Sequence, residues 1–233
     1  MKQLLIASTS TVHGSGYLDY LLDTIRIHFK NVKTVLFIPY ARPGGMSHED
    51  YTKLVQLVFS KINKTVKGLH EFEHPKDAIT NAEGIFIGGG NTFVLVDQLY
   101  KINIIETLKT AIESGTPYLG TSAGSNICGL SIGTSNDMPI AYPKSFQTMG
   151  LVPFNINPHY LDPDPKSTHM GETRETRIKE FHVFNNVSVL GLREGSWLEV
   201  MDQKIILKGA LQARLFQKNQ LPLELASGSE IAL

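Results

Sequence analysis

The segment with the clearest chemical potential runs from Gly120 to Asn126 and reads Gly-Thr-Ser-Ala-Gly-Ser-Asn. It matches G-x-S-x-G, in which a serine sits on a tight turn between a strand and a helix. The apolar residues before it predict a strand, and the small residues after it predict a helix start whose N–H groups face a developing anion. The pattern indicates Ser122 as a nucleophile, although an ordinary Gly/Ser turn after a strand has the same letters.

A serine nucleophile needs a base to take its proton. Of the eight histidines, His159 is the best candidate, because Pro158 stiffens the backbone before it in a loop-rich segment. His169 lies ten residues further along the same loop and is the competitor. The remaining histidines are typical of surface or structural positions.

Two carboxylates are candidates for the acid that orients this base. Asp137 lies in a proline-containing loop, where an aspartate is also a common turn residue. Glu194 follows the apolar run from 187 to 192, and side chains at the carboxyl ends of strands often line active sites. The sequence alone leaves both candidates open.

A run of three glycines and Asn91 follows a further predicted strand. Such a turn can cradle a phosphate, but it is not G-x-G-x-x-G and no P-loop lysine follows. Gly90 or Gly89 can instead supply an oxyanion donor beside the N–H of Ala123, and each such donor is worth about 3 kcal/mol. The missing lysine and the zero net charge favour the second use.

Arg174 and Arg177 lie three residues apart on one face of a predicted helix over 172–183. Arginines in this arrangement are usually solvated and salt-bridged. The functional interpretation is that a guanidinium binds a substrate carboxylate through two parallel hydrogen bonds.

The elements that must position these residues alternate between short apolar runs and amphipathic segments. Ser47 and Asp50 resemble an N-cap and its partner at the start of one helix. Predicted strands cover 4–7, 35–38, 65–72, 84–87 and 118–120, with helices over 17–29, 51–59, 92–100 and 104–113 between them. This alternation predicts an α/β fold with a mostly parallel sheet.

The texture changes after about residue 150. A loop-rich stretch over 155–171 precedes the helix over 172–183. The run 187–192 is expected to be a last strand of the sheet, and short runs from 197 to 216 are expected to form antiparallel hairpins. Because no Gly/Ser-rich linker marks a boundary, residues 1–233 are predicted to form a single domain.

The composition narrows the function classes. The chain has 233 residues with 22 Lys+Arg against 22 Asp+Glu, so its formal charge is zero, which argues against a nucleic-acid partner. A single cysteine, Cys128, excludes an internal disulfide framework and a cysteine-based metal site. No apolar stretch approaches the ~18 residues of a membrane span. A cytoplasmic protein without a membrane partner is expected.

Together the motifs resemble the dipeptidase E (aspartyl dipeptidase) family of serine peptidases, and they occur in the family's order. They are Ile87-Gly88-Gly89-Gly90-Asn91-Thr92-Phe93, Ser122-Ala123-Gly124, Thr134-Ser135-Asn136-Asp137-Met138-Pro139, Asn155-Ile156-Asn157-Pro158-His159, Gly171-Glu172-Thr173-Arg174-Glu175 and Glu194-Gly195-x-Trp197. Thr121 and Arg193 depart from the family's pattern and are expected to alter the shape of the pocket. The resemblance covers residues 85 to 200.

The resemblance implies a flavodoxin-like fold related to class I glutamine amidotransferases, with helices on both faces of the sheet. It implies hydrolysis of dipeptides with an N-terminal aspartate, without metal or cofactor. Ser122 and His159 would be nucleophile and base, with Asp137 or Glu194 as the acid. Gly90 or Gly89 with Ala123 would form the oxyanion hole.

From the chemistry of the substrate, Arg174 is expected to bind its aspartyl carboxylate, with Arg177 second and Asn91 as a further contact. A monomer or homodimer is expected. The alternatives are a cyanophycinase-like β-aspartyl peptidase, or a non-catalytic module that binds nucleotides or other small molecules.

Overall fold

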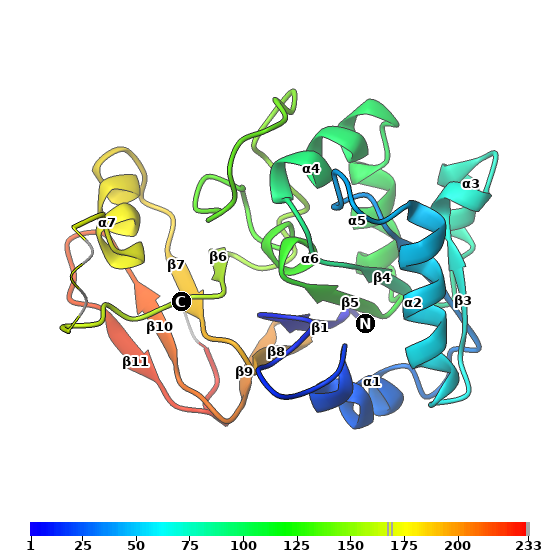
Figure 1. Ribbon diagram of the computed structural model, residues 1–233, viewed down its shortest axis with the longest axis horizontal. Helices are drawn as coiled ribbons and strands as arrows, with labels where there is room; N and C mark the ends of the chain where they lie inside the picture. The colour runs from blue at the N-terminus through cyan, green and yellow to red at the C-terminus, as the bar shows by residue number, and fades with distance from the viewer. Residues whose placement is uncertain (167, 169, 232–233) are drawn as a thin grey trace.

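The computed structural model describes residues 1–166, 168 and 170–231. Its larger sheet has seven strands in the order β3-β2-β4-β5-β1-β8-β9 (Figure 1). The first five are parallel and the last two antiparallel. Their bounds are β1 (Gln3–Ala7), β2 (Thr34–Ile38), β3 (Thr65–Gly68), β4 (Ile85–Ile87), β5 (Tyr118–Thr121), β8 (Ser196–Met201) and β9 (Lys204–Gly209).

Helices cover both faces of this sheet, which explains why its parallel strands are apolar on both sides. Alternate residues of β1 show the division: Leu4 and Ile6 belong to one core cluster, Leu5 and Ala7 to another. The first cluster packs against α3 (Pro75–Thr80), α4 (Thr92–Lys101) and α5 (Ile105–Glu113). The second packs against α1 (Leu22–His28) and α2 (His48–Ser60). Short 3-10 turns occupy Asp19–Leu21 and Leu69–Glu71.

The local signals behave as expected at several element ends. The Ser47 hydroxyl accepts a hydrogen bond from the N–H of Asp50 at 3.0 Å, which confirms the predicted cap of α2. The α/β class, the mostly parallel sheet and the antiparallel hairpins near the C-terminus are also confirmed.

A second sheet of four strands lies beside the first, in the order β11-β10-β7-β6 (Figure 1). Its strands β6 and β7 are parallel, and its other pairs are antiparallel. The bounds are β6 (Asn155–Pro158), β7 (Val189–Leu192), β10 (Ala213–Phe216) and β11 (Leu223–Leu225). Helix α7 (Arg174–Phe184) packs on it through Ile178 and Phe181.

The expectation that 187–192 closes the main sheet was wrong. All four residues of β7 are buried, and the strand lies between β6 and β10 in the second sheet. The place beside β1 is taken by β8, whose residues alternate between buried and more exposed, as suits a strand near the open side of a sheet.

The two sheets nevertheless share one core. Ile156, Leu190 and Ala213 from the second sheet belong to the same buried cluster as Leu4 and Leu198 from the first. No helix in the described part of the chain is long and apolar enough to cross a membrane.

Candidate active site

Ser122 occupies a strained turn between β5 and α6 (Ala123–Asn126), with φ 53° and ψ −108°. L-residues rarely adopt this conformation, and such strain is concentrated at functional sites. Hydrogen bonds hold the turn in place: the Ser122 N–H donates to the carbonyl of Ala7 at 3.2 Å, and the Ser122 carbonyl accepts from Ser125 and Asn126. The G-x-S-x-G pattern therefore does form a strand–turn–helix elbow.

The two glycines of this pattern are required by close packing. A Cβ on Gly124 would overlap the carbonyl oxygen of Ile87 at the end of β4. A Cβ on Gly120 would lie 2.6 Å from the carbonyl oxygen of Gly124. Without side chains at these positions, α6 can sit directly against the ends of β4 and β5, with Ser122 at its N-terminus.

Two hydrogen bonds connect Ser122, His159 and Glu194. His159 Nε2 lies 2.9 Å from the Ser122 Oγ, and His159 Nδ1 lies 2.6 Å from Glu194 Oε1. Because a carboxylate only accepts, Nδ1 carries the proton and Nε2 accepts from the serine hydroxyl. The imidazole is thus oriented to remove the serine proton. The histidine and glutamate side chains are 35% and 54% exposed, so solvent reaches this group.

A buried serine that the sequence analysis did not single out for this role fixes the histidine. Ser8 follows β1, and its Oγ accepts from the backbone N–H of His159 at 2.9 Å and donates to the carbonyl of Leu192 at 2.7 Å. His159 has φ 53°, so its backbone needs such support. One hydroxyl therefore joins the ends of β1, β6 and β7. Its only sequence signal is a serine directly after the first strand.

Asp137 lies elsewhere. Its carboxylate accepts from the N–H of Thr92 at 2.7 Å, from the Thr92 hydroxyl at 2.5 Å and from Ser135 Oγ at 3.2 Å. These contacts place a negative charge at the N-terminus of α4, where the helix dipole favours it. In the described part of the chain the only carboxylate hydrogen-bonded to His159 is that of Glu194.

Asn91 also serves this junction, since its side chain is already occupied. Its Oδ1 caps α4 by accepting from Val94 at 3.1 Å, and its Nδ2 donates to the carbonyl of Met138 at 2.8 Å. Asn136, in the same loop as Asp137 and Met138, contacts the residue directly before His159. Its Nδ2 donates to the carbonyl of Pro158 at 2.8 Å. The Asp137 loop thus supports the histidine from behind.

The glycine turn after β4 lies against the serine. A Cβ on Gly89 would approach the Ser122 Cβ to 3.0 Å, and a Cβ on Gly90, whose φ is +148°, would overlap the carbonyl of Ala41. Within the described residues no acceptor takes the N–H of Gly89, Gly90 or Ala123. These donors remain available for an oxyanion.

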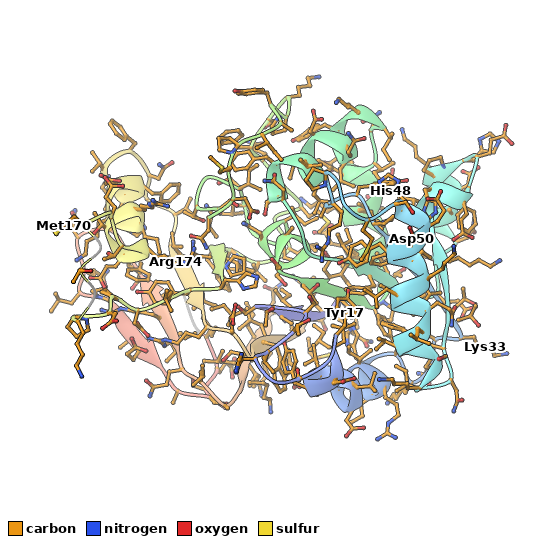
Figure 2. The ribbon with its side chains drawn as sticks, viewed as in Figure 1. Tyr17, Lys33, His48, Asp50, Met170 and Arg174 are labelled. Carbon is orange, nitrogen blue, oxygen red and sulfur yellow. The ribbon has the colours of Figure 1, made fainter. Side chains whose placement is uncertain are left out.

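Arg174 begins α7, whose N-cap Thr173 accepts from Thr176. Figure 2 shows it on the side of α7 that faces the rest of the molecule, whereas Met170 lies at the outer edge. Burial and the positive charge of Arg177 lower the pKa of Arg174, while the charges of Asp137 and Glu194 oppose that shift. Arg174 therefore lies within electrostatic reach of the serine–histidine–glutamate group.

Arg177 makes no hydrogen bond or ion pair with Ser122, His159 or Glu194 in the described part of the chain. It is exposed and pairs with Glu172 at 3.7 Å, which is the solvated arrangement expected for most helix-surface arginines. His169, the competitor for the role of base, lies outside the described residues. In the described ranges no group of three His, Cys, Asp or Glu side chains is arranged to hold a metal ion.

An ion-pair network fastens the second sheet around Glu194. Its centre is Arg193, which donates to both carboxylate oxygens of Asp162 at 2.8 Å and to Glu224 at 2.9 and 3.0 Å. Arg214 extends the network to Glu175 at 3.0 Å. Hydrogen bonds from Arg193 lower the pKa of Asp162. The network thus joins the residue before Glu194 to the loop after His159 and to the start of α7.

Comparisons with known proteins identify the family of the chain. The family model described as Peptidase family S51 matches residues 4–208. A Streptomyces coelicolor protein named Peptidase E is 48% identical over 98% of this chain and 93% of its own length. A Drosophila melanogaster protein named "Probable alpha-aspartyl dipeptidase" is 45% identical over 97% of this chain and 94% of its own.

The fold comparison agrees as well. A crystal structure of a peptidase from an acI-B1 actinobacterium has a TM-score of 0.75 at 16% identity, covering 100% of this chain and 97% of that one. That likeness concerns the fold. The family match and the relatives extend over nearly the whole sequence, and on that ground the chain belongs to peptidase family S51.

Proposed function

We propose that this protein is a serine exopeptidase that hydrolyses dipeptides with an N-terminal aspartate, through Ser122, His159 and Glu194. The observation that carries the proposal is the pair of hydrogen bonds from the Ser122 hydroxyl through the His159 imidazole to the Glu194 carboxylate. The names of the two relatives, Peptidase E and "Probable alpha-aspartyl dipeptidase", support the substrate class.

The reaction follows from these positions. Ser122 Oγ attacks the carbonyl carbon of the aspartyl residue while His159 Nε2 takes the hydroxyl proton. The negative charge on the tetrahedral intermediate is accepted by the N–H of Ala123 and that of Gly90 or Gly89. His159 then gives its proton to the leaving amine, the C–N bond breaks, and a water activated by the same histidine hydrolyses the acyl-enzyme.

Selectivity for aspartate requires a cation beside this group. Arg174 fits that role, because it is half-buried and has no acidic partner within 4.0 Å in the described part of the chain. A planar guanidinium can bind the aspartyl side-chain carboxylate through two parallel hydrogen bonds. Arg177 remains the second choice, and Asn91, whose side chain caps α4, is assigned a supporting place behind the site.

The test combines one reactive probe with a peptide panel. A fluorophosphonate should label Ser122, and Ser122→Ala should abolish both labelling and the release of aspartate from Asp-Leu. Glu194→Gln should lower kcat by about 10³-fold or more, because the base loses its orienting carboxylate, and Asp137→Asn should have a much smaller effect. If Asp137→Asn instead abolishes turnover while Glu194→Gln does not, the acid is misassigned.

The panel should include Asp-Leu, Ala-Leu, Glu-Leu, Asn-Leu and an isoaspartyl dipeptide. Arg174→Gln should raise KM for Asp-Leu by about 10- to 100-fold and leave Ala-Leu unchanged. Preference for the isoaspartyl peptide would support a cyanophycinase-like β-aspartyl peptidase. No labelling, together with thermal stabilisation by nucleotides, would support a binding module instead.

The proposal includes a single domain over residues 1–233, a cytoplasmic location and a monomer or homodimer without a nucleic-acid partner. The shared core of the two sheets supports the single domain, and the zero formal charge supports the absence of nucleic acid. Cell fractionation and light scattering test the location and the assembly.

A further inference from the structure

The arginines of this protein divide into two groups. The chain has six of them. Four have an acidic partner: Arg26 with Asp23 at 2.9 Å, Arg177 with Glu172 at 3.7 Å, Arg193 with Asp162 at 2.8 Å, and Arg214 with Glu175 at 3.0 Å. Arg42 and Arg174 have no acidic group within 4.0 Å in the part of the chain that the structure describes. Their charges are therefore free to bind an external anion.

Arg42 lies beside the glycine turn. The preceding residue, Ala41, accepts a hydrogen bond from the N–H of Asn91 at 2.7 Å, and its carbonyl fills the space where a Gly90 side chain would be. This carbonyl packs against the glycine turn, and the same turn packs against Ser122. The backbone of Arg42 therefore starts next to the candidate active site.

A tyrosine orients the Arg42 side chain. Its guanidinium carbon lies 5.0 Å from the centre of the Tyr51 ring, a cation–π contact. The Tyr51 hydroxyl in turn donates to the carbonyl of Gly89 at 3.2 Å, and Gly89 packs on Ser122. Stacking on a ring occupies one face of the guanidinium and leaves the N–H groups on its edge free for a carboxylate.

The two unpaired arginines approach from different sides. Arg174 comes from α7 beside the second sheet, and Arg42 follows β2 in the main sheet. Figure 2 shows Arg174 and Tyr17 on opposite sides of α6, and the Tyr17 hydroxyl lies 3.4 Å from that of Tyr51. The two arginines therefore belong to different sheets, Arg42 beside the glycine turn that packs on Ser122 and Arg174 at the start of α7.

An Asp-Xaa dipeptide carries two carboxylates, one on each side of the bond to be cut. The side-chain carboxylate belongs to the aspartyl residue, and the terminal carboxylate lies about one residue, ~4 Å, beyond the scissile bond. On the basis of the proposed function, we infer that Arg42 binds the C-terminal carboxylate of the leaving residue. A longer peptide has an amide at that position, so the same contact would select dipeptides.

The experiment compares an acid with its amide. Wild-type protein should cleave Asp-Leu in preference to Asp-Leu-amide. Arg42→Gln should lower kcat/KM for Asp-Leu by about 10- to 100-fold and leave the amide within about 2-fold. Arg42→Lys, which keeps the charge, should recover part of the loss. The matched control is Arg26→Gln, at an exposed arginine paired with Asp23, which should change neither substrate.

A binding measurement separates this inference from the proposed function. Asp-Leu and Asp-Leu-amide are titrated calorimetrically into Ser122→Ala, with and without Arg42→Gln. Tighter binding of Asp-Leu than of Asp-Leu-amide, lost with Arg42→Gln, supports the subsite. It does so even if the wild-type protein shows no turnover, because absent turnover would count against the proposed function alone. Equal affinity for acid and amide, or an equal loss on both in Arg42→Gln, overturns the subsite.

Discussion

The two sheets bring their shares of the site into place by different physical means. The main sheet holds Ser122 by backbone fit, in which glycines let α6 and the turn after β4 approach without side chains between them. His159 and Glu194 follow strands of the second sheet and are held by polar side chains, namely Ser8 at the end of β1 and the network around Arg193. Ser122 is thus fixed by steric fit, and His159 and Glu194 by charge and hydrogen bonding.

This difference has a consequence for tolerance to change. A backbone fit leaves no room for even one methyl group, because the neighbouring atoms are themselves main chain. A charged network loses only part of its energy when one member is removed, and its partly exposed members remain hydrated. The two regions should therefore respond to different substitutions and by different amounts.

The largest effect is expected at the backbone fit. Gly124→Ala should destabilise the protein by about 3 kcal/mol or more, because the new Cβ overlaps the carbonyl of Ile87 and the strand must shift. Urea denaturation measures this, and fluorophosphonate labelling should fall with it. Gly44→Ala, at a position with nothing within 4 Å, is the matched control and should stay within about 0.5 kcal/mol. Equal stability of the two variants would contradict the steric account.

An intermediate effect is expected in the network. Arg193 is only 13% exposed, and Arg193→Met would leave Asp162 and Glu224 without their main partner. A loss of about 2 kcal/mol in stability is expected, less than for a fully buried pair because both acids are partly hydrated. The value of kcat should fall by about 10-fold as Glu194 loses its support.

The exposed pair of Arg177 provides the comparison for that substitution. Arg177→Met should cost less than about 0.5 kcal/mol, as is usual for a surface ion pair. If Arg193→Met is equally mild, the second sheet does not depend on its charges.

The smallest effect is expected for His28, which contacts the first residue of β5. His28 Nε2 lies 3.0 Å from the carbonyl of Tyr118, and burial lowers the pKa of His28 from 6.5 to about 4. Between pH 4 and pH 6.5, His28 is therefore protonated in the unfolded chain and neutral in the folded chain. Stability should be full well above pH 6.5 and decline as the pH falls, by about 1–2 kcal/mol at pH 5.

Denaturation at pH 7.5 and pH 5 checks this dependence. His28→Gln should reduce the difference in unfolding free energy between the two pH values, whereas His13→Gln, at an exposed loop position, should not. An unchanged pH slope in His28→Gln would contradict the assignment. Labelling of Ser122 should be little affected, since His28 lies away from the site.

Much of the main sheet could be predicted from the sequence, because parallel strands covered on both faces are short apolar runs separated by helical patterns. The turn at Ser122 was also predictable, because its glycines are required by close packing within a short segment and its neighbours. Helix α3 was not predicted, and β6 was taken for loop. Strand β6 contains Asn155 and Asn157, whose buried side-chain amides hydrogen-bond to the backbone of Ser131 and Thr134.

The choice between Asp137 and Glu194 could not be made from the sequence. Both follow or precede turns, and only the position of β7 in the second sheet brings one of them to His159. The same applies to Ser8 and Arg42, whose roles depend on contacts with residues far along the chain. A short sequence motif predicts the conformation of its own segment. The roles of Glu194, Ser8 and Arg42 depend instead on which strands become neighbours in the fold.

The hydroxyl of Ser8 also bears on when activity first becomes possible during synthesis. It joins a residue made at the very start of translation to His159 and to Leu192, which are 151 and 184 positions later. A ribosome that has made only the chain up to the end of α6 has released Ser122 without His159 or Glu194. The nascent chain should therefore remain hydrolytically silent until the segment with Glu194 has emerged and folded back onto its first strand.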